Sequence, residues 1–315
     1  MIKRFIRTVI ALVVTAVVGL LLNGFFRDNG FIDEHPPPGK VLGVPGERIH
    51  GIQVKGQGER TVVFLHGNPG TSLDFEKVQK LLSPIAPSVA FDRPGYGWSE
   101  RSKPDMGPRA QAVAIHSAVK QLQLQRPVIA GFSYGGLVAL AYALEYPDET
   151  GALALIAPVA DPVEGHPMKG AQANLVLPGV GPMIAYGAGP LLAPDAVAQG
   201  YVDAFYPQEP DVEVVQLGRL HFARASVLLA SARDWNVIKT ELPDLAKRYE
   251  QVDVPVELVW GRQDRIVGES HVKYLQEHVK GIKVVQVENC GHQMMSTHPE
   301  DVVEVVKRAL ARVEK

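Results

Sequence analysis

Short apolar segments alternate with helical segments along most of this chain, and this alternation restricts the fold more than any other feature. The segments expected to be strands are residues 48–54, 60–66, 88–92, 127–130, 152–157, 254–260 and 282–287. The segments expected to be helices are residues 72–82, 108–124, 134–146 and 299–313. Strands that are apolar throughout are buried on both faces, and helices between them connect them in parallel. The sequence therefore predicts an α/β fold, with a mostly parallel central sheet flanked by helices.

The alternation breaks after residue 158. Residues 159–241 are rich in proline and glycine, and residues 170–194 contain no charged side chain. Pro178, Pro182 and Pro190 argue against a membrane-spanning helix in this stretch. We predict a helical cap, or lid, inserted at 159–241 above the carboxyl ends of the strands, where open α/β sheets bind their ligands. The core domain then consists of residues 41–158 and 242–315.

The N-terminus has the composition of a membrane anchor. Lys3, Arg4 and Arg7 precede residues 8–26, which are uncharged and apolar on every helical face. The 19 residues of this run would span ~28 Å as an α-helix, close to the thickness of the hydrocarbon core of a bilayer. We predict a transmembrane signal anchor at residues 1–27, followed by an extended, proline-rich spacer at residues 28–40.

The charges on either side of this segment predict its orientation. The basic residues come before it, whereas Asp28, Asp33 and Glu34 come after it. The positive-inside rule then keeps the N-terminus in the cytoplasm and places the rest outside, in the periplasm of a bacterium. Two alternatives stay open: a cleaved signal peptide, which would give a secreted protein, and a buried helix of a soluble core. No N-x-[ST] sequon occurs, so the sequence does not favour a glycosylating compartment.

Composition narrows the classes of partner. The net charge is −2 and no basic run occurs outside the N-terminus, so the charge pattern of a nucleic-acid-binding protein is missing. Cys290 is the single cysteine, which excludes an internal disulfide, and we interpret it as a small buried side chain. No pattern of metal ligands or of nucleotide-binding glycines implies a cofactor. The sequence carries no signal for the oligomeric state.

One motif points to nucleophilic chemistry. Residues 131–136 read GFSYGG, after an expected strand and at the start of an expected helix. A G-x-S-x-G pattern is weak when it stands alone, because it also occurs as a plain glycine-rich turn. In a strand–turn–helix context it forms a sharp turn that lifts the serine above the sheet. Ser133 is therefore the candidate nucleophile.

A serine needs a general base, and the base needs an orienting acid. His292 follows Gly291 just after the last expected strand, and Asp264 lies in the loop after the preceding strand. The chain order Ser133, Asp264, His292 is the order in which hydrolases with this kind of turn carry their triads. Asp161, after the strand at 152–157, is a rival for the role of the acid.

A tetrahedral intermediate needs donors for its oxyanion. We predict that the backbone N–H groups of Tyr134 and Asn68 supply them, Asn68 lying in the loop HGNPG at 66–70. The side chains of Asn68 and Tyr134 either face the pocket as well or are satisfied locally. His66 ends a buried strand, and we interpret it as structural.

From Val41 to Val313 the chain resembles the α/β-hydrolase fold superfamily. The motifs that carry the resemblance are HGNPG at 66–70, DRPGYGWS at 92–99, GFSYGG at 131–136, GRQDRIV at 261–267 and the pair Gly291–His292. The resemblance implies a serine hydrolase with the triad Ser133, Asp264 and His292. It also implies that Asp92 and Arg93 belong to a structural turn.

The HGNPG loop resembles that of dehalogenases and epoxide hydrolases. Those families use an aspartate nucleophile, whereas the turn at 131–136 carries a serine. In such relatives the Asn-Pro bond of the loop is often cis, which the Asn68–Pro69 bond would share.

Several functions remain compatible with these motifs. The leading hypothesis is a carboxylic ester hydrolase that acts on a small-molecule or lipid-like ester through an acyl-enzyme on Ser133. The same triad also serves carbon–carbon bond hydrolases and peptidases of the proline-iminopeptidase type, which hold a substrate amine with acidic residues. The acidic candidates for that purpose are Asp161, Glu164, Asp203 and Glu209. A membrane-tethered binding protein without turnover is the alternative of another class.

The uncharged part of the cap suggests one further property. Residues 175–194 are mostly apolar, and the short spacer would keep the cap close to the membrane. Either this surface dips into the membrane interface, or it packs the cap onto the core.

Overall fold

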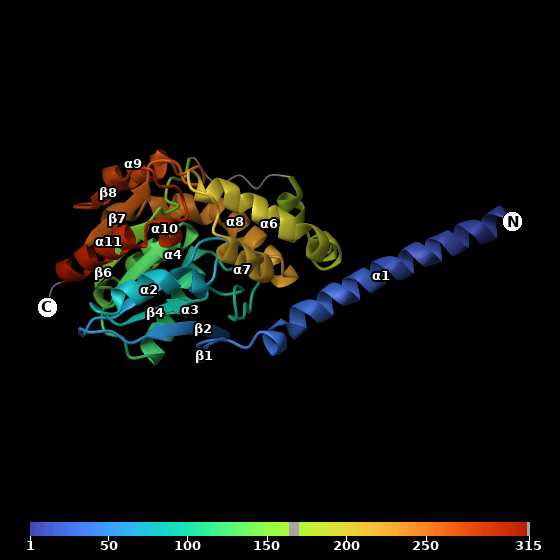
Figure 1. Cartoon of the computed structure of the whole chain (residues 1–315), viewed down its shortest axis with the longest axis horizontal. Coiled ribbons are helices and arrows are strands. Elements are labelled where there is room, and N and C mark those ends of the chain that lie inside the picture. The colour runs from blue at the N-terminus through green and yellow to red at the C-terminus, as the bar shows by residue number, and fades with distance from the viewer. Residues whose placement is uncertain (164–169, 314–315) are drawn as a thin grey trace.

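The computed structural model describes residues 1–163 and 170–313, and its centre is a sheet of eight strands in the order β1-β2-β4-β3-β5-β6-β7-β8 (Figure 1). The strands are β1 (Lys40–Val44), β2 (Glu47–Val54), β3 (Val62–Leu65), β4 (Ser88–Phe91), β5 (Val128–Phe132), β6 (Ala152–Ile156), β7 (Val256–Gly261) and β8 (Lys283–Val287). β2 runs antiparallel to both β1 and β4, and every pair from β4 to β8 is parallel. This confirms the predicted, mostly parallel α/β sheet.

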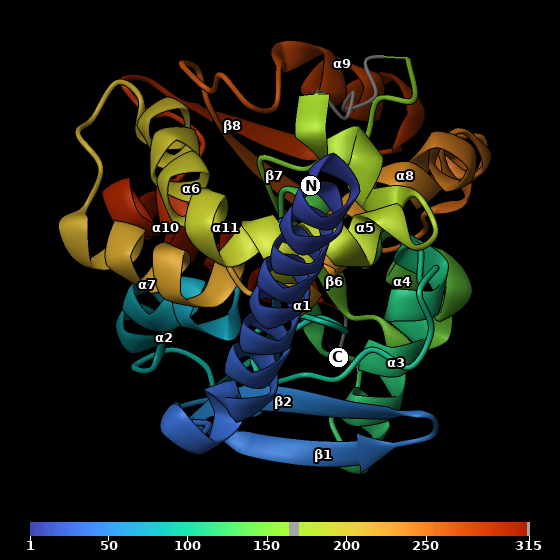
Figure 2. The ribbon, with the colours of Figure 1, turned by 90° about the vertical axis from the view of Figure 1, so that its right-hand side faces the viewer.

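The central strands β3 to β7 are buried along their whole length. They are the apolar runs of the sequence, and parallel strands of this kind need helices on both faces. One face carries α2 (Glu76–Leu82) and α11 (Pro299–Arg312), which pack against each other, and the other carries α3 (Pro108–Gln121) and α4 (Tyr134–Glu145) (Figure 2). The remaining core elements are η1 (Ser72–Phe75), η2 (Pro147–Glu149), η5 (Tyr249–Gln251), α9 (Glu269–His278) and α10 (Met294–Thr297).

A helical segment joins β6 to β7. Its described helices are η3 (Gly170–Val176), α5 (Val180–Met183), η4 (Ile184–Ala188), α6 (Gly189–Phe205), α7 (Val212–Phe222) and α8 (Ala225–Ala246). We call residues 159–246 the insertion. Helix α8 continues past the predicted boundary at 241 and includes Pro243 in its last turn.

Helix α1 (Ile2–Glu34) is long enough and apolar enough to cross a membrane, and it projects away from the rest of the molecule (Figure 1). The predicted spacer at 28–40 is largely absent as extended chain. The helix continues to Glu34 and Lys40 already belongs to β1, so only residues 35–39 lie between them. The physical reason is packing, because the last turns of α1 contact the insertion and Phe31 is buried.

Candidate active site

Ser133 lies at the sharp turn between β5 and α4. Its backbone has φ 54° and ψ −119°, a conformation that costs free energy for a residue with a side chain. Two hydrogen bonds hold it there: the Ser133 amide donates to the Ile156 carbonyl over 2.9 Å, and its carbonyl accepts from the Val159 amide over 3.1 Å. The end of β6 and the residues just after it thus hold the turn.

Glycines permit this turn. A Cβ atom at Gly131 would collide with the carbonyl oxygen of Gly135, and one at Gly135 would collide with the carbonyl oxygen of Leu65 in β3. Helix α4 can therefore approach the strands closely only because these positions lack side chains. The predicted strand–turn–helix context of GFSYGG is present.

His292 and Asp264 form a close pair at the same end of the sheet. The Nδ1 atom of His292 lies 2.6 Å from Oδ2 of Asp264, and both side chains are buried. The other carboxylate oxygen, Oδ1, accepts from the amides of Ile266 over 2.8 Å and Val267 over 2.9 Å. A carboxylate held by two N–H donors is an acceptor, so Nδ1 of His292 carries the hydrogen and Nε2 carries the lone pair.

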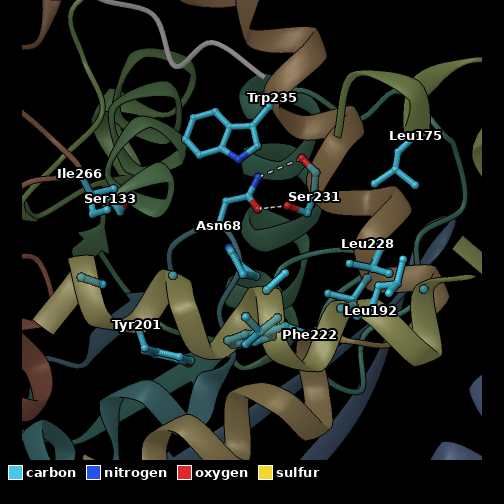
Figure 3. Close-up of a pocket in the computed structure, with 18 of the residues that line it drawn as sticks. Asn68, Ser133, Leu175, Leu192, Tyr201, Phe222, Leu228, Ser231, Trp235 and Ile266 are labelled. Carbon is cyan, nitrogen blue, oxygen red and sulfur yellow. Dashed lines mark hydrogen bonds between the residues drawn. The ribbon is translucent and has the colours of Figure 1, made fainter. Parts of the chain in front are cut away.

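Ser133 and His292 line the same cavity, which has a volume of about 420 Å³. The ring of Phe132 packs beside the imidazole of His292, with 4.7 Å between the ring centroids. The insertion supplies most of the cavity wall, including Leu175, Ile184, Leu192, Tyr201, Phe222 and Trp235 (Figure 3). Of the lining residues in the described part of the chain, none is Asp, Glu, Lys or Arg. A serine hydroxyl and a histidine imidazole therefore belong to the wall of one apolar chamber.

Asn68 also lines this cavity, but its side chain is held by α8. Its Nδ2 donates to the Ser231 carbonyl over 3.2 Å, and the Ser231 hydroxyl donates to its Oδ1 over 2.6 Å (Figure 3). The amide side chain is therefore satisfied locally. The Asn68–Pro69 bond is cis.

The Tyr134 side chain is likewise satisfied locally rather than in the cavity. Its hydroxyl donates to the Asp234 carbonyl over 3.4 Å, and its ring lies 4.6 Å from the guanidinium of Arg93. Burial raises its pKa well above the usual value for tyrosine. Tyr134 is the first residue of α4, so its amide belongs to the helix N-terminal donors that have no partner within the helix.

Buried charges connect the core to the insertion. Arg93 is completely buried and donates to Asp234 of α8 over 2.8 Å and to the carbonyls of His66 and Gly67 over 2.9 and 2.8 Å. Arg101 donates to the other oxygen of Asp234, also over 2.8 Å. The network explains why Arg93 acts as scaffold rather than as a ligand for substrate.

The neighbouring acid Asp92 is also scaffold. It is completely buried, and its two oxygens accept from the amides of Ser72 and Trp98 over 2.6 and 3.0 Å. Its Oδ2 also lies 2.7 Å from Nδ1 of His50.

The other polar candidates occupy structural positions. His66 is buried, its Nε2 accepts from the Arg93 amide over 2.9 Å, and burial followed by the charge of Arg93 lowers its pKa to about 3. Asp161, the rival acid, accepts from the Val163 amide, whereas the partner of His292 is Asp264. Burial raises the pKa of the Cys290 thiol to about 12. Within residues 1–163 and 170–313, no three His, Cys, Asp or Glu side chains gather as metal ligands.

Sequence reasoning missed the contribution of α8. Val227, Ser231 and Trp235 all line the cavity, and they are spaced four residues apart. That spacing places them on one face of the helix, above the HGNPG loop. The spacing was visible in the sequence, but the partner of that face was not.

The sequence profile of the alpha/beta hydrolase fold matches residues 60–299, about three quarters of the chain. This chain belongs to the α/β-hydrolase fold family. Its similarity extends to a pimeloyl-[acyl-carrier protein] methyl ester esterase of Neisseria meningitidis, at 29% identity over 76% of this chain and 90% of that protein. Human monoacylglycerol lipase is 25% identical over 80% of this chain and 76% of that protein. A 2-hydroxy-6-oxononadienedioate/2-hydroxy-6-oxononatrienedioate hydrolase of Escherichia coli is 26% identical over 84% of this chain and 91% of that protein.

Solved structures show the same architecture. An α/β-hydrolase fold protein from Burkholderia ambifaria superposes with a TM-score of 0.70 and 23% identity, over 85% of this chain and 96% of that one. A structure described as a membrane phospholipase A covers 99% of both chains, with a TM-score of 0.66 and 22% identity. The comparisons place this α/β hydrolase among hydrolytic enzymes.

Proposed function

We propose that this α/β hydrolase is a serine hydrolase that cleaves carboxylic esters with an apolar acyl chain. One observation carries the proposal: Ser133, on its strained turn, and His292, paired with Asp264 over 2.6 Å, line one apolar cavity. A nucleophile, a base and an orienting acid that meet beside an apolar chamber are what acyl transfer requires.

The proposed reaction has two halves. The Ser133 hydroxyl attacks the ester carbonyl carbon while Nε2 of His292 takes its proton, and Asp264 stabilises the imidazolium that forms. The tetrahedral intermediate collapses as the C–O bond to the alcohol breaks, and the alcohol leaves with the proton from His292. Water then attacks the acyl carbon as His292 takes one of its protons. The bond between this carbon and Ser133 Oγ breaks as His292 passes that proton to Oγ, which releases the acid and restores Ser133.

Two backbone donors would stabilise the oxyanion. The Tyr134 amide lies at the N-terminus of α4, where the helix dipole also favours negative charge. The Asn68 amide lies in a loop that the side-chain contacts with Ser231 hold against α8. We propose these two amides as the oxyanion hole.

The lining of the cavity favours an ester over the alternatives. A dicarboxylate of the kind named for the E. coli relative would bring two negative charges, and no Lys or Arg is among the described lining residues. A substrate amine would need an acid, but Asp203 and Glu209 are exposed and line no part of this cavity. Glu164 lies outside the described residues. The complete Ser133, His292 and Asp264 set argues against a binding protein without turnover.

We further propose that α1 anchors the enzyme in a membrane and that the insertion forms a cap over Ser133. The apolar window of α1 is wholly exposed, and the basic residues before it favour a cytoplasmic N-terminus with the catalytic domain on the other side. The packing of Asp28 and Phe31 against the insertion favours a helix that is retained rather than cleaved. A membrane-borne ester or lipid-like molecule is the substrate class that this arrangement suits.

The test combines covalent labelling with turnover. The full-length protein in detergent is treated with a fluorophosphonate probe and assayed with p-nitrophenyl esters from acetyl to dodecanoyl. We expect the probe to label the wild type and the surface control Ser117→Ala, but not Ser133→Ala. We also expect esters of medium chain length to be hydrolysed faster than the acetate. Labelling that persists in Ser133→Ala, or ester turnover that is unaffected by it, would refute the proposal.

A further inference from the structure

Helix α1 packs closely against η4 of the insertion. A Cβ atom at Gly24 would collide with the backbone carbonyl of Tyr186, so the two backbones touch at this position. The ring centroids of Phe25 and Tyr186 lie 6.2 Å apart. The Leu21 side chain lies 3.5 Å from the position that a Cβ atom would occupy at Gly187. The contact therefore involves Leu21 to Phe25 of α1.

A second contact fixes the same helix one to two turns further along. Asp28 accepts from the Ser226 hydroxyl over 2.9 Å, and the guanidinium of Arg224 lies 4.0 Å from the centroid of the Phe31 ring. Phe31 is only 4% exposed. Two contact levels on one straight helix determine its direction relative to the insertion.

These contacts determine where η4 lies along the apolar run of α1, and therefore how deep it would lie in a bilayer. The uncharged apolar run of α1 ends at Phe26, so the residues that touch η4 lie inside the run. At ~1.5 Å per residue, Leu21 lies ~8 Å before its end along the helix axis. When this run spans the hydrocarbon core, η4 lies beside its outer edge, at the depth of ~5–10 Å that is typical of interfacial helices.

The insertion presents an apolar surface on the side where η4 contacts the apolar run of α1. Leu177, Val180, Met183, Leu191 and Leu192 are exposed, the last at 69%, and residues 170–194 carry no charge. Figure 2 views the molecule from the side on which α1 projects, and α5 and α6 lie on this face beside α1. An uncharged, apolar surface beside an apolar helix matches a lipid bilayer rather than water.

The cavity of Ser133 reaches the same surface. Its wall includes Ile184 and Ala188 of η4 and Leu192 of α6. Leu192 both lines the cavity and is largely exposed, so it lies at the rim. We infer that residues 175–194 are seated in the membrane interface, and that the Ser133 cavity opens there into the lipid, so that an acyl ester enters directly from the bilayer.

The placement of residues 175–194 in the membrane interface rests on the proposed anchoring by α1, whereas the entry of an ester also rests on the proposed ester hydrolysis. The experiment therefore has two arms. Both use the full-length protein in vesicles of phosphatidylcholine and phosphatidylglycerol, because α1 is part of the docked structure.

The first arm measures depth. Single cysteines at Met183→Cys and Leu191→Cys carry a fluorophore, with Lys307→Cys on α11 as an exposed control at the far end of the core; Cys290 is buried and would not be labelled. We expect lipids brominated on their acyl chains to quench the labels at 183 and 191 but not the label at 307. Quenching of 183 and 191 by aqueous iodide instead would overturn the inference. Shielding from both quenchers would also overturn it, since a protein partner would then cover the surface.

The second arm measures access. Met183 and Leu191 are exposed and line no part of the cavity, so the double variant Met183→Asp/Leu191→Asp places charge in the interface without altering the site. We expect turnover of a long-chain monoacyl ester in the vesicles to fall about tenfold, while soluble p-nitrophenyl acetate turnover is unchanged. Val113→Asp, at a similarly exposed apolar position on α3, should change neither. Equal loss for both esters would overturn entry from lipid. If the wild type hydrolyses neither ester, the proposed function is refuted. The depth measurement then still tests whether residues 175–194 lie in the membrane interface.

Discussion

Asp264 has a separate partner for each of its carboxylate oxygens. One faces Nδ1 of His292, and the other accepts from the amides of the loop that carries it. In the proposed triad, the loop contacts thus position the carboxylate of Asp264, and this carboxylate positions the imidazole of His292. Because the two oxygens have different partners, a single substitution at Asp264 can disturb the contact with His292 and keep the contacts that hold the loop.

Asp264→Asn should preserve the fold and remove the activity. The asparagine oxygen can still accept from the loop amides, but its NH₂ group then faces Nδ1 and forces the hydrogen of His292 onto Nε2. We expect ester turnover to fall by about 10⁴-fold, with little change in melting temperature. Asp161→Asn is the matched control and should retain activity; if it is the variant that loses activity, the acid is wrongly assigned.

His221 gives a prediction for stability against pH. It is buried beside Phe31 and Trp98, and burial lowers its pKa from 6.5 to about 4. Unfolded His221 binds a proton below pH 6.5, whereas the folded form does so only near pH 4, so protonation favours unfolding as the pH falls through this window. The loss approaches ~1.4 kcal/mol per pH unit for one such group.

The His221→Phe variant should lack this contribution. Its urea-unfolding midpoint should therefore depend less on pH between 4 and 6.5 than that of the wild type, with similar values at pH 8. An unchanged pH dependence would show that His221 does not titrate in this way.

The residues of the proposed triad were the easier part to locate from the sequence. Ser133, Asp264 and His292 each follow an apolar strand, and their order along the chain is diagnostic in this fold. Ser231 was not predictable in the same way, because its contact with Asn68 joins residues 163 positions apart. A serine within a helix has no local feature that reveals a partner on a distant loop.

At the scale of elements, the end of α1 is part of the folded domain, in addition to the anchoring role proposed for the helix. Its last turns bury Phe31 and place Asp28 against Ser226, so they belong to the folded domain. A chain that starts at Asp33 would lose both contacts, whereas a chain that starts at Leu20 would keep them.

We expect the chain starting at Asp33 to melt on the order of 5–10 °C below the chain starting at Leu20. The reason is that removal of a buried phenylalanine costs ~3 kcal/mol or more. Thermal unfolding of both forms in detergent checks this. Equal melting temperatures would show that the end of α1 adds nothing to the domain.

Helix α8 positions the loop that carries the proposed oxyanion donor. Ser231→Ala removes the hydroxyl that donates to Asn68, so the loop amide should lose its fixed place. We expect kcat for p-nitrophenyl esters to fall about tenfold with KM nearly unchanged, and Ser231→Thr to restore most of it. A change in KM alone would assign Ser231 to substrate binding instead.

Element boundaries show where the sequence misleads. Three consecutive prolines after Glu34 suggested an extended spacer from residue 28, but tertiary contacts keep Asp28 to Glu34 helical. Similarly, α8 runs past Pro243 because its face packs along the core. Strand β1 was missed because it is short and half exposed, and its hairpin with β2 supplies the pairing that fixes it.

For the whole molecule, the cavity is a joint product of the core and the insertion. Gly200 of α6 lines it and is exposed, and a side chain there would meet no atom within 4 Å. Gly200→Phe should therefore narrow the mouth without a clash and shift the preferred ester from octanoyl towards acetyl. Gln199→Leu, a neighbouring exposed position that does not line the cavity, should leave the preference unchanged. The measurement is the turnover of p-nitrophenyl esters of increasing chain length by the wild type and both variants. Identical chain-length profiles for the wild type and Gly200→Phe would show that the mouth of the cavity lies elsewhere.

The overall architecture was predictable because apolar strands and their connecting helices follow directly from the pattern of buried residues. The position of the insertion relative to α1 was not, since it depends on Gly24 meeting Tyr186 across 162 positions of sequence.

Asp234 limits which segments could replace the insertion of this chain. It lies on α8 of the insertion, yet it neutralises Arg93 and Arg101 of the core. A chimera that received another relative's insertion without a carboxylate at this position would enclose a guanidinium with no counter-ion, at a cost of several kcal/mol. A foreign insertion is therefore expected to fold onto this core only when it supplies a carboxylate that reaches Arg93 and Arg101.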